Sequence, residues 1–453
     1  MKKDMTKGSV FGSLIIFSLP YLLSCFLQSF YGLADLFIVG RFNGADSITA
    51  VSIGSQIMHM LTVIIIGLTT GTTVTVAHAV GAGDEAGVKR AVGNTIRLFA
   101  GFAVIATVLL LALSDLILKA LSTPQEAFLQ ARQYILICFA GLPFIVAYNV
   151  IAGIFRGIGD TRSPLLFVTA AGIINIALDY VLVGPLGLKA AGAAAATTVS
   201  QIIAVILSLV YLKKSAGSSL LVPGKAGMRY NGSTFGAITR VGIPIALQDG
   251  LIQISFLVIT AIANARGLEM AAAVGVVEKF ISFVFLVPSA MSASVSAIAA
   301  QNAGAGLHAR GKKILYYALS VCIVYGILIS AICWFSAEGI VSVLSGEIGM
   351  VAVYGGQYLR SYAFDTILAG IHFCFSGYFC AYSMAMIPFI HNITSAILVR
   401  IPLAKFTSVR FPETLFPMGF AAPAGSLLSA LICVAAYIFF NRKGSFSKDM
   451  AGS

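Results

Sequence analysis

Charged side chains are scarce in this sequence: Asp, Glu, Lys and Arg together make up 10% of its 453 residues. A soluble domain carries about 25% charge to cover its surface. Hydrophobic residues reach 58% and the mean hydropathy is +0.96, so no large soluble domain fits in the chain. The composition predicts an all-α polytopic membrane protein, with apolar residues enough for roughly a dozen helices of about 20 residues.

The residue patterns of catalysis and of metal binding are also missing. The seven cysteines stand in apolar runs without a CxxC or CxxxC pair, which argues against a disulfide framework or a metal site. The five histidines are scattered, and no Ser/His/Asp set, metal-spaced His pair or phosphate loop occurs. We therefore expect neither an enzyme nor a cofactor.

Twelve apolar runs follow one another along the chain. Backbone groups in lipid must bond internally, so each run is predicted to be a transmembrane helix. The first is expected to be retained, because no small-residue cleavage site follows the basic start MKKDMTKGSV. The predicted spans are 14–39, 51–79, 95–118, 133–155, 164–186, 190–212, 238–263, 271–300, 314–336, 357–380, 385–408 and 417–441.

The net charge of +12 reflects membrane topology. With the N-terminus inside, 18 of the 29 Lys and Arg residues fall in inner segments, Lys2, Lys3 and Lys448 among them, and 8 in outer ones. This asymmetry follows the positive-inside rule and predicts that both termini are cytoplasmic. A nucleic-acid partner is therefore not expected.

The chain also repeats itself. Pro20 in SLPYLL and Pro244 in GIPIAL stand 224 residues apart. The same offset relates Tyr134 to Tyr358, Gly153 to Gly377 and Pro164 to Pro388. An even number of helices in each half makes the repeats parallel, related by a pseudo-two-fold axis along the membrane normal, as in two-lobed alternating-access transporters. The predicted parts are an N-terminal lobe (1–212), a cytoplasmic linker (213–236) and a C-terminal lobe (237–453).

Two acids in the first half have no basic residue at their depth. A charge at mid-bilayer costs at least about 2.5–3.5 kcal/mol, so Asp35 and Asp179 are expected to hold protons, share one, or bind a cation. Asn175 lies one turn before Asp179, and Thr197 falls in the same outer half of the membrane. Their oxygens suit Na⁺, and the acids suit H⁺ equally. The alternatives are a structural Asp179–Asn175 bond and an Asp35–Arg41 pair.

The second half sets three acids against two bases, Lys279 and Arg400. Compensating ion pairs and a second cation or proton site are both compatible with this balance. The acids are Asp249, Glu278 and Asp365.

Other polar or helix-bending residues lie inside predicted spans. Pro20 removes one backbone hydrogen bond and permits a hinge, although an ordinary kink is equally compatible. Gln28, Tyr31 and Asn149 are expected to face an N-lobe cavity or to bond between helices.

An ordered series of strings resembles the multidrug and toxic compound extrusion (MATE) transporters over nearly the whole chain. The strings are LPYLLSCFLQSFYGLADLFIVGRF, GAGDEAGVKRAVGN, FRGIGDTRSPLL, INIALDY, VGIPIALQ, AQNAGAG and VRIPLA. The first half is most similar to the prokaryotic DinF-like branch. The family's cation-site positions fall on Asp35, Asn175, Asp179 and Thr197, with Gln28, Tyr31 and Asn149 nearby. The C-lobe acids of the NorM-like branch would fall on Ile252 and Ala369, which puts such a site in doubt.

The resemblance implies a monomeric secondary antiporter of a bacterial or archaeal cytoplasmic membrane, surrounded by lipid. It would export cationic or amphiphilic organic compounds in exchange for Na⁺ or H⁺ by alternating access. A flippase for a lipid or a lipid-linked saccharide is the alternative, because related exporters share the two-lobe plan. The acidic N-lobe favours cationic substrates.

Overall fold

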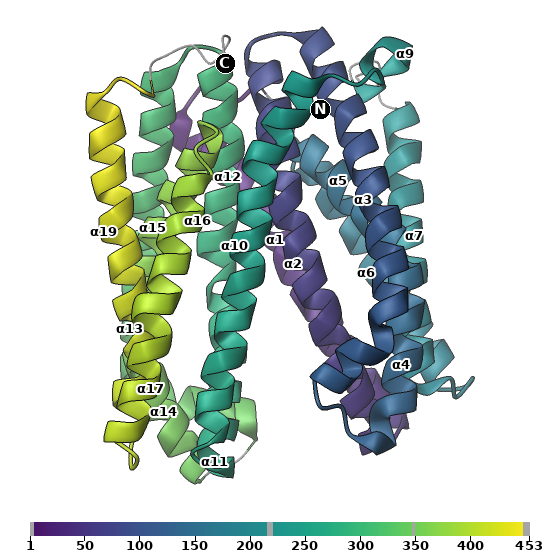
Figure 1. The fold of residues 1–453 in the computed structure, drawn as a ribbon, viewed down its shortest axis with the longest axis vertical. Helices are drawn as coiled ribbons and strands as arrows, with labels where there is room; N and C mark the ends of the chain where they lie inside the picture. The colour runs from purple at the N-terminus through teal and green to yellow at the C-terminus, as the bar shows by residue number, and fades with distance from the viewer. Residues whose placement is uncertain (1–3, 215–220, 347–348, 447–453) are drawn as a thin grey trace. The chain divides into compact units, whose positions relative to one another are not determined.

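The computed structural model describes residues 4–214, 221–346 and 349–446, so Lys2, Lys3, Lys448 and part of the predicted linker lie outside the described residues. Within these ranges the chain folds as helices joined by short turns, without a β-strand (Figure 1). The helices are α1 (Val10–Phe42), α2 (Ala45–Gly81), α3 (Glu85–Ala120), α4 (Gln125–Ala140), α5 (Leu142–Gly157), α6 (Arg162–Val183), α7 (Lys189–Lys214), α9 (Gly224–Gly227), α10 (Gly232–Asn264), α11 (Leu268–Val284), α12 (Leu286–Gly304), α13 (His308–Ser345), α14 (Met350–Tyr362), α15 (Asp365–Ala381), α16 (Met386–Ser395), the π-helix η1 (Ala396–Arg400), α17 (Ile401–Arg410), α18 (Phe416–Gly419) and α19 (Ala421–Arg442).

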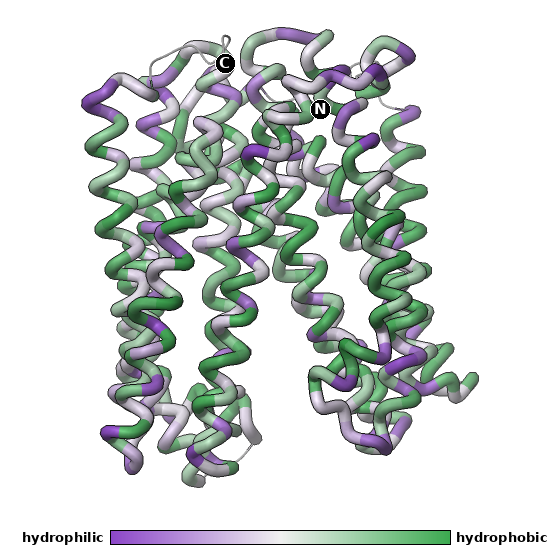
Figure 2. The backbone as a smooth tube through the Cα atoms, in the orientation of Figure 1, coloured by the Kyte–Doolittle hydropathy of each residue, from purple (hydrophilic) through white to green (hydrophobic). Residues whose placement is uncertain are grey.

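The described helices supply ten membrane spans by length and hydropathy, and twelve when each of two bent pairs counts as one span. The bent pairs are α4–α5, with an angle of 49°, and α14–α15, with an angle of 44°. The expected all-α architecture of twelve spans is thereby confirmed. Hydrophobic residues fill the middle of the spans and hydrophilic residues gather toward their ends (Figure 2). Large apolar side chains such as Phe37 and Phe335 are exposed, which is compatible with a lipid environment.

The chain forms two compact units that exchange their first helical segments. Unit 1 contains residues 1–4 and 19–242, and unit 2 contains residues 5–18 and 243–453. Besides the boundary between residues 4 and 5, the chain passes from one unit to the other at two points within long helices, after Ser18 in α1 and after Gly242 in α10. Each of these two helix crossings is two residues or fewer from a helix-interior proline, Pro20 or Pro244. The predicted division at 213–236 follows chain order and does not anticipate this exchange.

In unit 1 the segment that precedes α10 docks on α3. Asn94 of α3 donates from Nδ2 to the Arg229 carbonyl oxygen over 3.3 Å, and its Oδ1 accepts from the Asn231 N–H over 2.9 Å. The first part of α10 then runs against α2, where a Cβ at Gly71 or Gly242 would overlap the neighbouring backbone. Backbones this close require glycine.

In unit 2 the N-terminal segment, which precedes α1, docks on α12 and α13, just as the segment before α10 docks on α3 in unit 1. Arg310 of α13 donates to the carbonyl oxygens of Gly8, Lys7 and Met5 over 2.8, 2.9 and 3.4 Å, and Asn302 of α12 also donates to Met5. The Met5 side chain is 2% exposed.

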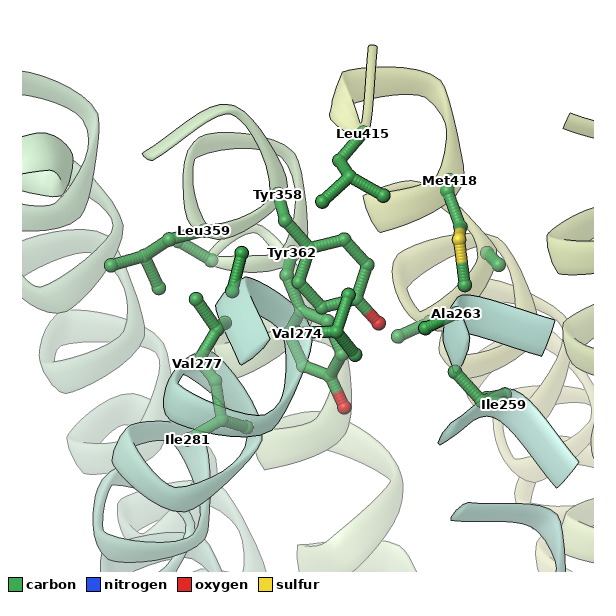
Figure 3. Close-up of a cluster of buried hydrophobic side chains, with 14 of the residues drawn as sticks. Ile259, Ala263, Val274, Val277, Ile281, Tyr358, Leu359, Tyr362, Leu415 and Met418 are labelled. Atoms are coloured by element: carbon green, nitrogen blue, oxygen red, sulfur yellow. The ribbon is translucent and has the colours of Figure 1, made fainter. Parts of the chain in front are cut away.

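The core of unit 2 includes a buried apolar cluster around two tyrosines of α14, Tyr358 and Tyr362. Side chains of α10, α11 and α18 surround them, among them Ile259, Val277 and Met418 (Figure 3). The repeat partner of Tyr358, Tyr134 on α4, is equally buried in unit 1. Gly153 and Gly377, another pair of the repeat, both pack closely on a neighbouring helix, α2 or α12. The internal repeat of the sequence therefore corresponds to repeated packing.

Candidate functional site

Two acids of unit 1 meet inside the membrane-spanning region. Asp35 on α1 is 5% exposed and Asp179 on α6 is fully buried, and their carboxyl groups lie within hydrogen-bonding range of each other. Two ionised carboxylates have no hydrogen to share and repel each other at this range. The contact is therefore favourable only when a proton or another cation lies between them.

Polar groups from two helices complete the arrangement. The Thr197 hydroxyl of α7 donates to Oδ2 of Asp35 over 3.3 Å. Asn175, one turn before Asp179 on the same face of α6, also lies beside Asp35 and is 4% exposed. The structure thus brings together Asp35, Asn175, Asp179 and Thr197, the four residues of the predicted coupling site. Their role in coupling remains a prediction.

No basic side chain neutralises these acids in the part of the chain that is described. Oδ1 of Asp35 and both carboxylate oxygens of Asp179 have no protein donor there. The ion pairs of the described residues lie elsewhere, at Arg90–Asp84, Arg132–Asp115 and Arg360–Glu338. Arg41, the alternative partner of Asp35, is exposed and makes no such pair. The site can therefore accept a positive charge, either as a proton or as a bound cation.

A cavity of about 90 Å³ adjoins these residues. Its volume suits a few water molecules or an ion, and is well below the roughly 300–1,000 Å³ of drug-sized sites. Among the predicted residues, Gln28, Asn149 and Thr197 line it. The remaining lining residues were not predicted: Met58, Thr62, Ile145, Tyr148 and Gln201. Gln201 follows Thr197 by one turn, a spacing that could have indicated it.

Tyr31 takes one of the two roles expected for it, a hydrogen bond between helices. Its hydroxyl donates to the Val168 carbonyl oxygen of α6 over 2.7 Å, and its ring covers Gly172, where a Cβ would overlap it. It is not among the residues that line the 90 Å³ cavity. The interhelical hydrogen bond, which was the alternative for this residue, is what the structure shows.

The three acids of the second half do not form one group. Glu278 accepts a hydrogen bond from the Thr260 hydroxyl over 3.1 Å, and Asp365 lies beside Ser426. The positive charge of Arg400 attracts the carboxylates of both Glu278 and Asp365. Asp249 instead accepts a hydrogen bond from Gln248 over 3.3 Å, and its charge affects the Cys380 thiol.

Arg400 and the acids around it are not joined by an ion pair among the described residues, because none has an N···O distance within 4.0 Å. The guanidinium instead donates to the Tyr362 hydroxyl over 2.7 Å and stacks on Phe256 at 4.5 Å from the ring centroid. Lys279 is exposed, so it does not balance the buried acids. Direct ion pairing is thus not the arrangement of these residues.

The MatE family model matches the chain twice, at residues 20–181 and 244–406, which reproduces the 224-residue offset of the two prolines. The chain belongs to the MatE family of membrane transporters. It is 27% identical over 405 residues to the probable multidrug resistance protein YpnP of Bacillus subtilis, covering 89% of this chain and 90% of that protein. It is 30% identical over 341 residues to the probable multidrug resistance protein YoeA of the same organism, covering 74% and 73%.

Solved structures share this fold over almost the full length. A crystal structure of a MATE protein in complex with MaL6 aligns with a TM-score of 0.89 at 19% identity, covering 97% of both chains. A MOP superfamily transporter from Pyrococcus furiosus also aligns with a TM-score of 0.89 at 19% identity, covering 98% of both chains. The family resemblance of the sequence is confirmed. Its assignment to the DinF-like branch stays a prediction.

Proposed function

We propose that this protein is a secondary antiporter that exports cationic or amphiphilic organic compounds in exchange for Na⁺ or H⁺ by alternating access. One observation carries the proposal: Asp35 and Asp179 lie side by side, buried, without a basic partner. The names of relatives support the substrate class, since YpnP and YoeA are named as probable multidrug resistance proteins and a Staphylococcus aureus relative, 23% identical, as the multidrug export protein MepA.

Exchange follows because the coupling cation and the cationic substrate compete for Asp35 and Asp179. A coupling cation neutralises the two carboxylates, and its departure leaves negative charge that attracts a cationic substrate. The four carboxylate oxygens, with the Asn175 carbonyl and the Thr197 hydroxyl, form the all-oxygen donor set that a hard cation prefers. A single proton shared between the carboxyl groups would serve the same purpose.

An anionic substrate is the specific alternative. A Shewanella oneidensis relative, 25% identical over 434 residues, is named as a FAD transporter. Two uncompensated acids in unit 1 would repel such a substrate, which favours the cationic class. A lipid or lipid-linked saccharide flippase is the other alternative, and movement of a fluorescent lipid between the two membrane leaflets would distinguish it.

The experiment is exchange transport in proteoliposomes. We expect efflux of a cationic dye driven by an imposed Na⁺ or pH gradient, and at least a tenfold loss in Asp35→Asn and Asp179→Asn. Asp115→Asn, which removes an exposed acid of unit 1 paired with Arg132, is the matched control and should transport like wild type. Wild-type rates in either site variant would refute the proposal. Scrambling of a fluorescent lipid without dye exchange would favour the flippase.

The proposed location is the cytoplasmic membrane of a bacterium or archaeon, with both termini cytoplasmic and the protein acting as a monomer. Cysteine substitutions at the chain ends, tested with an impermeant reagent in whole cells and inverted vesicles, check the orientation.

A further inference from the structure

Unit 1 contains a buried arginine that the proposed antiport does not use. Arg156 is the penultimate residue of α5 and is 8% exposed. Its guanidinium lies over the ring of Tyr21 on α1, with 5.1 Å between Cζ and the ring centroid. Arginine stays protonated in proteins, so this residue places a permanent positive charge inside the folded unit.

No acid is paired with this charge among the described residues. The ion pairs found there involve other arginines, and Arg156 makes no hydrogen bond to a described residue. Asp160 follows Arg156 by four residues, but its carboxylate accepts from the Arg162 N–H and from the N–H and hydroxyl of Ser163. A buried charge is costly unless it is paired, so the N–H groups of Arg156 call for an acceptor.

The side chains around the guanidinium are polar but neutral. Cys25 of α1, one turn after Tyr21, and Tyr148 of α5, about two turns before Arg156, both lie within its electrostatic reach. The Tyr148 hydroxyl donates to the Pro164 carbonyl oxygen over 3.2 Å, and Tyr148 also lines the cavity of about 90 Å³. Arg156 therefore lies beyond Tyr148, on the side of the cavity toward the end of α5.

The exposed part of Arg156 includes its polar end. A nitrogen that lacked both a partner and accessible surface would belong to the buried unpartnered atoms of the described chain. Those atoms include Nε of Arg266, Arg310 and Arg400, but no nitrogen of Arg156. Since Arg156 has no hydrogen-bond partner, its residual exposure reaches the guanidinium nitrogens, and a small ligand can approach them.

We propose that Arg156 and Tyr21 form a binding site for an oxyanion, the carboxylate or phosphate group of an amphiphilic molecule. A planar guanidinium presents parallel N–H donors that match the two oxygens of such a group. The Tyr21 ring lies against the guanidinium and helps to hold it in place. The oxyanion comes either from a transported compound with an acidic end or from the headgroup of an acidic lipid.

This site is separate from the acidic pair of unit 1 and does not rest on the proposed antiport. Tyr21 precedes Asp35 by fourteen residues, which is about 21 Å along α1 at 1.5 Å per residue. An oxyanion at Arg156 therefore avoids the repulsion of Asp35 and Asp179 at close range. Unit 1 can thus hold opposite charges at two depths.

The test is fluorine NMR of para-trifluoromethylbenzoate added to protein in the uncharged detergent dodecyl maltoside. Its uncharged match, para-trifluoromethylbenzyl alcohol, and empty micelles report partition into detergent. We expect Arg156→Gln to bind the benzoate at least about tenfold more weakly than wild type, because a charge-assisted pair is lost. Arg162→Gln, which removes an exposed arginine at the start of α6, is the matched control and should bind like wild type.

Mass spectrometry of co-purified phosphatidylglycerol distinguishes the two sources of the oxyanion. If a lipid occupies the site, wild type retains phosphatidylglycerol that Arg156→Gln loses, and added phosphatidylglycerol displaces the benzoate. If a transported compound occupies it, the benzoate binds and the lipid does not displace it.

Two further variants keep the test decisive. If Arg156→Gln does not fold, Arg156→Lys keeps the charge without the planar fork and should bind the benzoate several-fold more weakly than wild type. Asp35→Asn should leave benzoate binding unchanged, whether or not dye transport depends on that acid. Equal benzoate affinity and equal lipid retention in wild type and the Arg156 variants would overturn the proposal.

Discussion

The Tyr31 hydroxyl donates to the Val168 carbonyl oxygen over 2.7 Å, and this bond joins α1 to α6 across 137 residues of sequence. Asp35 follows Tyr31 by one helical turn, and Asn175 and Asp179 follow Val168 on the same face of α6. The tyrosine bond therefore sets the register in which the acids meet.

Removing that bond should weaken the site without unfolding the protein. We expect Tyr31→Phe to lower the free energy of unfolding by about 0.5–1.5 kcal/mol, the usual net contribution of one hydrogen bond. Dye exchange should fall several-fold, because Asp35 loses its fixed position opposite Asp179. Thermal unfolding in detergent and initial transport rates measure the two effects. A variant with full transport would show that the register does not depend on this hydroxyl.

Gly172 gives the same contact a steric test. A Cβ at this position would overlap the Tyr31 ring, so Gly172→Ala should force α1 away from α6 and reduce both stability and transport. An overpacked core substitution costs about 1–3 kcal/mol. Gly101→Ala on the exposed face of α3, where nothing lies within 4 Å, is the control and should be neutral or slightly stabilising. Equal behaviour of the two variants would contradict the packing argument.

Thr197 distinguishes the two coupling ions. Thr197→Ala removes one oxygen donor beside Asp35, while Thr197→Ser retains it. If Na⁺ binds here, loss of one ligand worth about 1 kcal/mol should raise the Na⁺ concentration for half-maximal transport about fivefold in the alanine variant alone. If protons are the coupling ion, transport at constant pH should show no dependence on the Na⁺ concentration in either variant. Transport at constant pH over a series of Na⁺ concentrations decides between them.

The two crossing prolines should control motion more than stability. Proline at position 20 cannot donate a backbone hydrogen bond inside α1, and Pro20→Ala restores that donor. We expect a thermal midpoint equal to or above that of wild type, with slower dye exchange because α1 bends less easily. Pro244→Ala in α10 is the matched variant, and a hinge at both crossings predicts the same result. Undiminished exchange in both variants would mean that the prolines are ordinary kinks.

Arg310 secures the N-terminal segment in unit 2. Lysine keeps the charge but cannot reach three carbonyl oxygens with one planar fork, so Arg310→Lys should expose the segment. We expect faster trypsin cleavage after Lys7 and a loss of about 1.5–3 kcal/mol in stability. Lys312→Arg on the same helix, which leaves these bonds intact, should cleave at the wild-type rate. Equal cleavage in both variants would argue against the anchoring role.

Hydropathy predicted the membrane spans well because lipid leaves the backbone few choices. It gave α1 as 14–39, whereas the helix extends over Val10–Phe42, since a helix continues into the polar boundary where hydropathy falls. The bends after Ala140 and after Tyr362 were not predicted, because a bend within an apolar run depends on packing. Because charged residues are scarce within the predicted spans, Asp35 and Asp179 could be selected from the sequence as candidate coupling residues.

Uncharged members of the sites were harder to recognise. Thr62 and Gln201 line the cavity, yet in sequence they resemble the many polar residues that bond within or between helices. The contact between the rings of His372 on α15 and His391 on α16, whose centroids are 5.4 Å apart, was missed for another reason. His372 and His391 are 19 residues apart on different helices, and only tertiary packing brings their rings together.

The exchange of helical segments has a consequence for the two sequence repeats. Residues 5–18 complete unit 2, and residues 19–242 of unit 1 include the start of α10. Two half-length polypeptides separated at the linker would each lack part of their own unit, and the second would leave Asn302 and Arg310 without the chain they bind. We expect such halves to be unstable alone and to recover by complementation when produced together. The repeats are therefore mutually dependent parts and not independent modules.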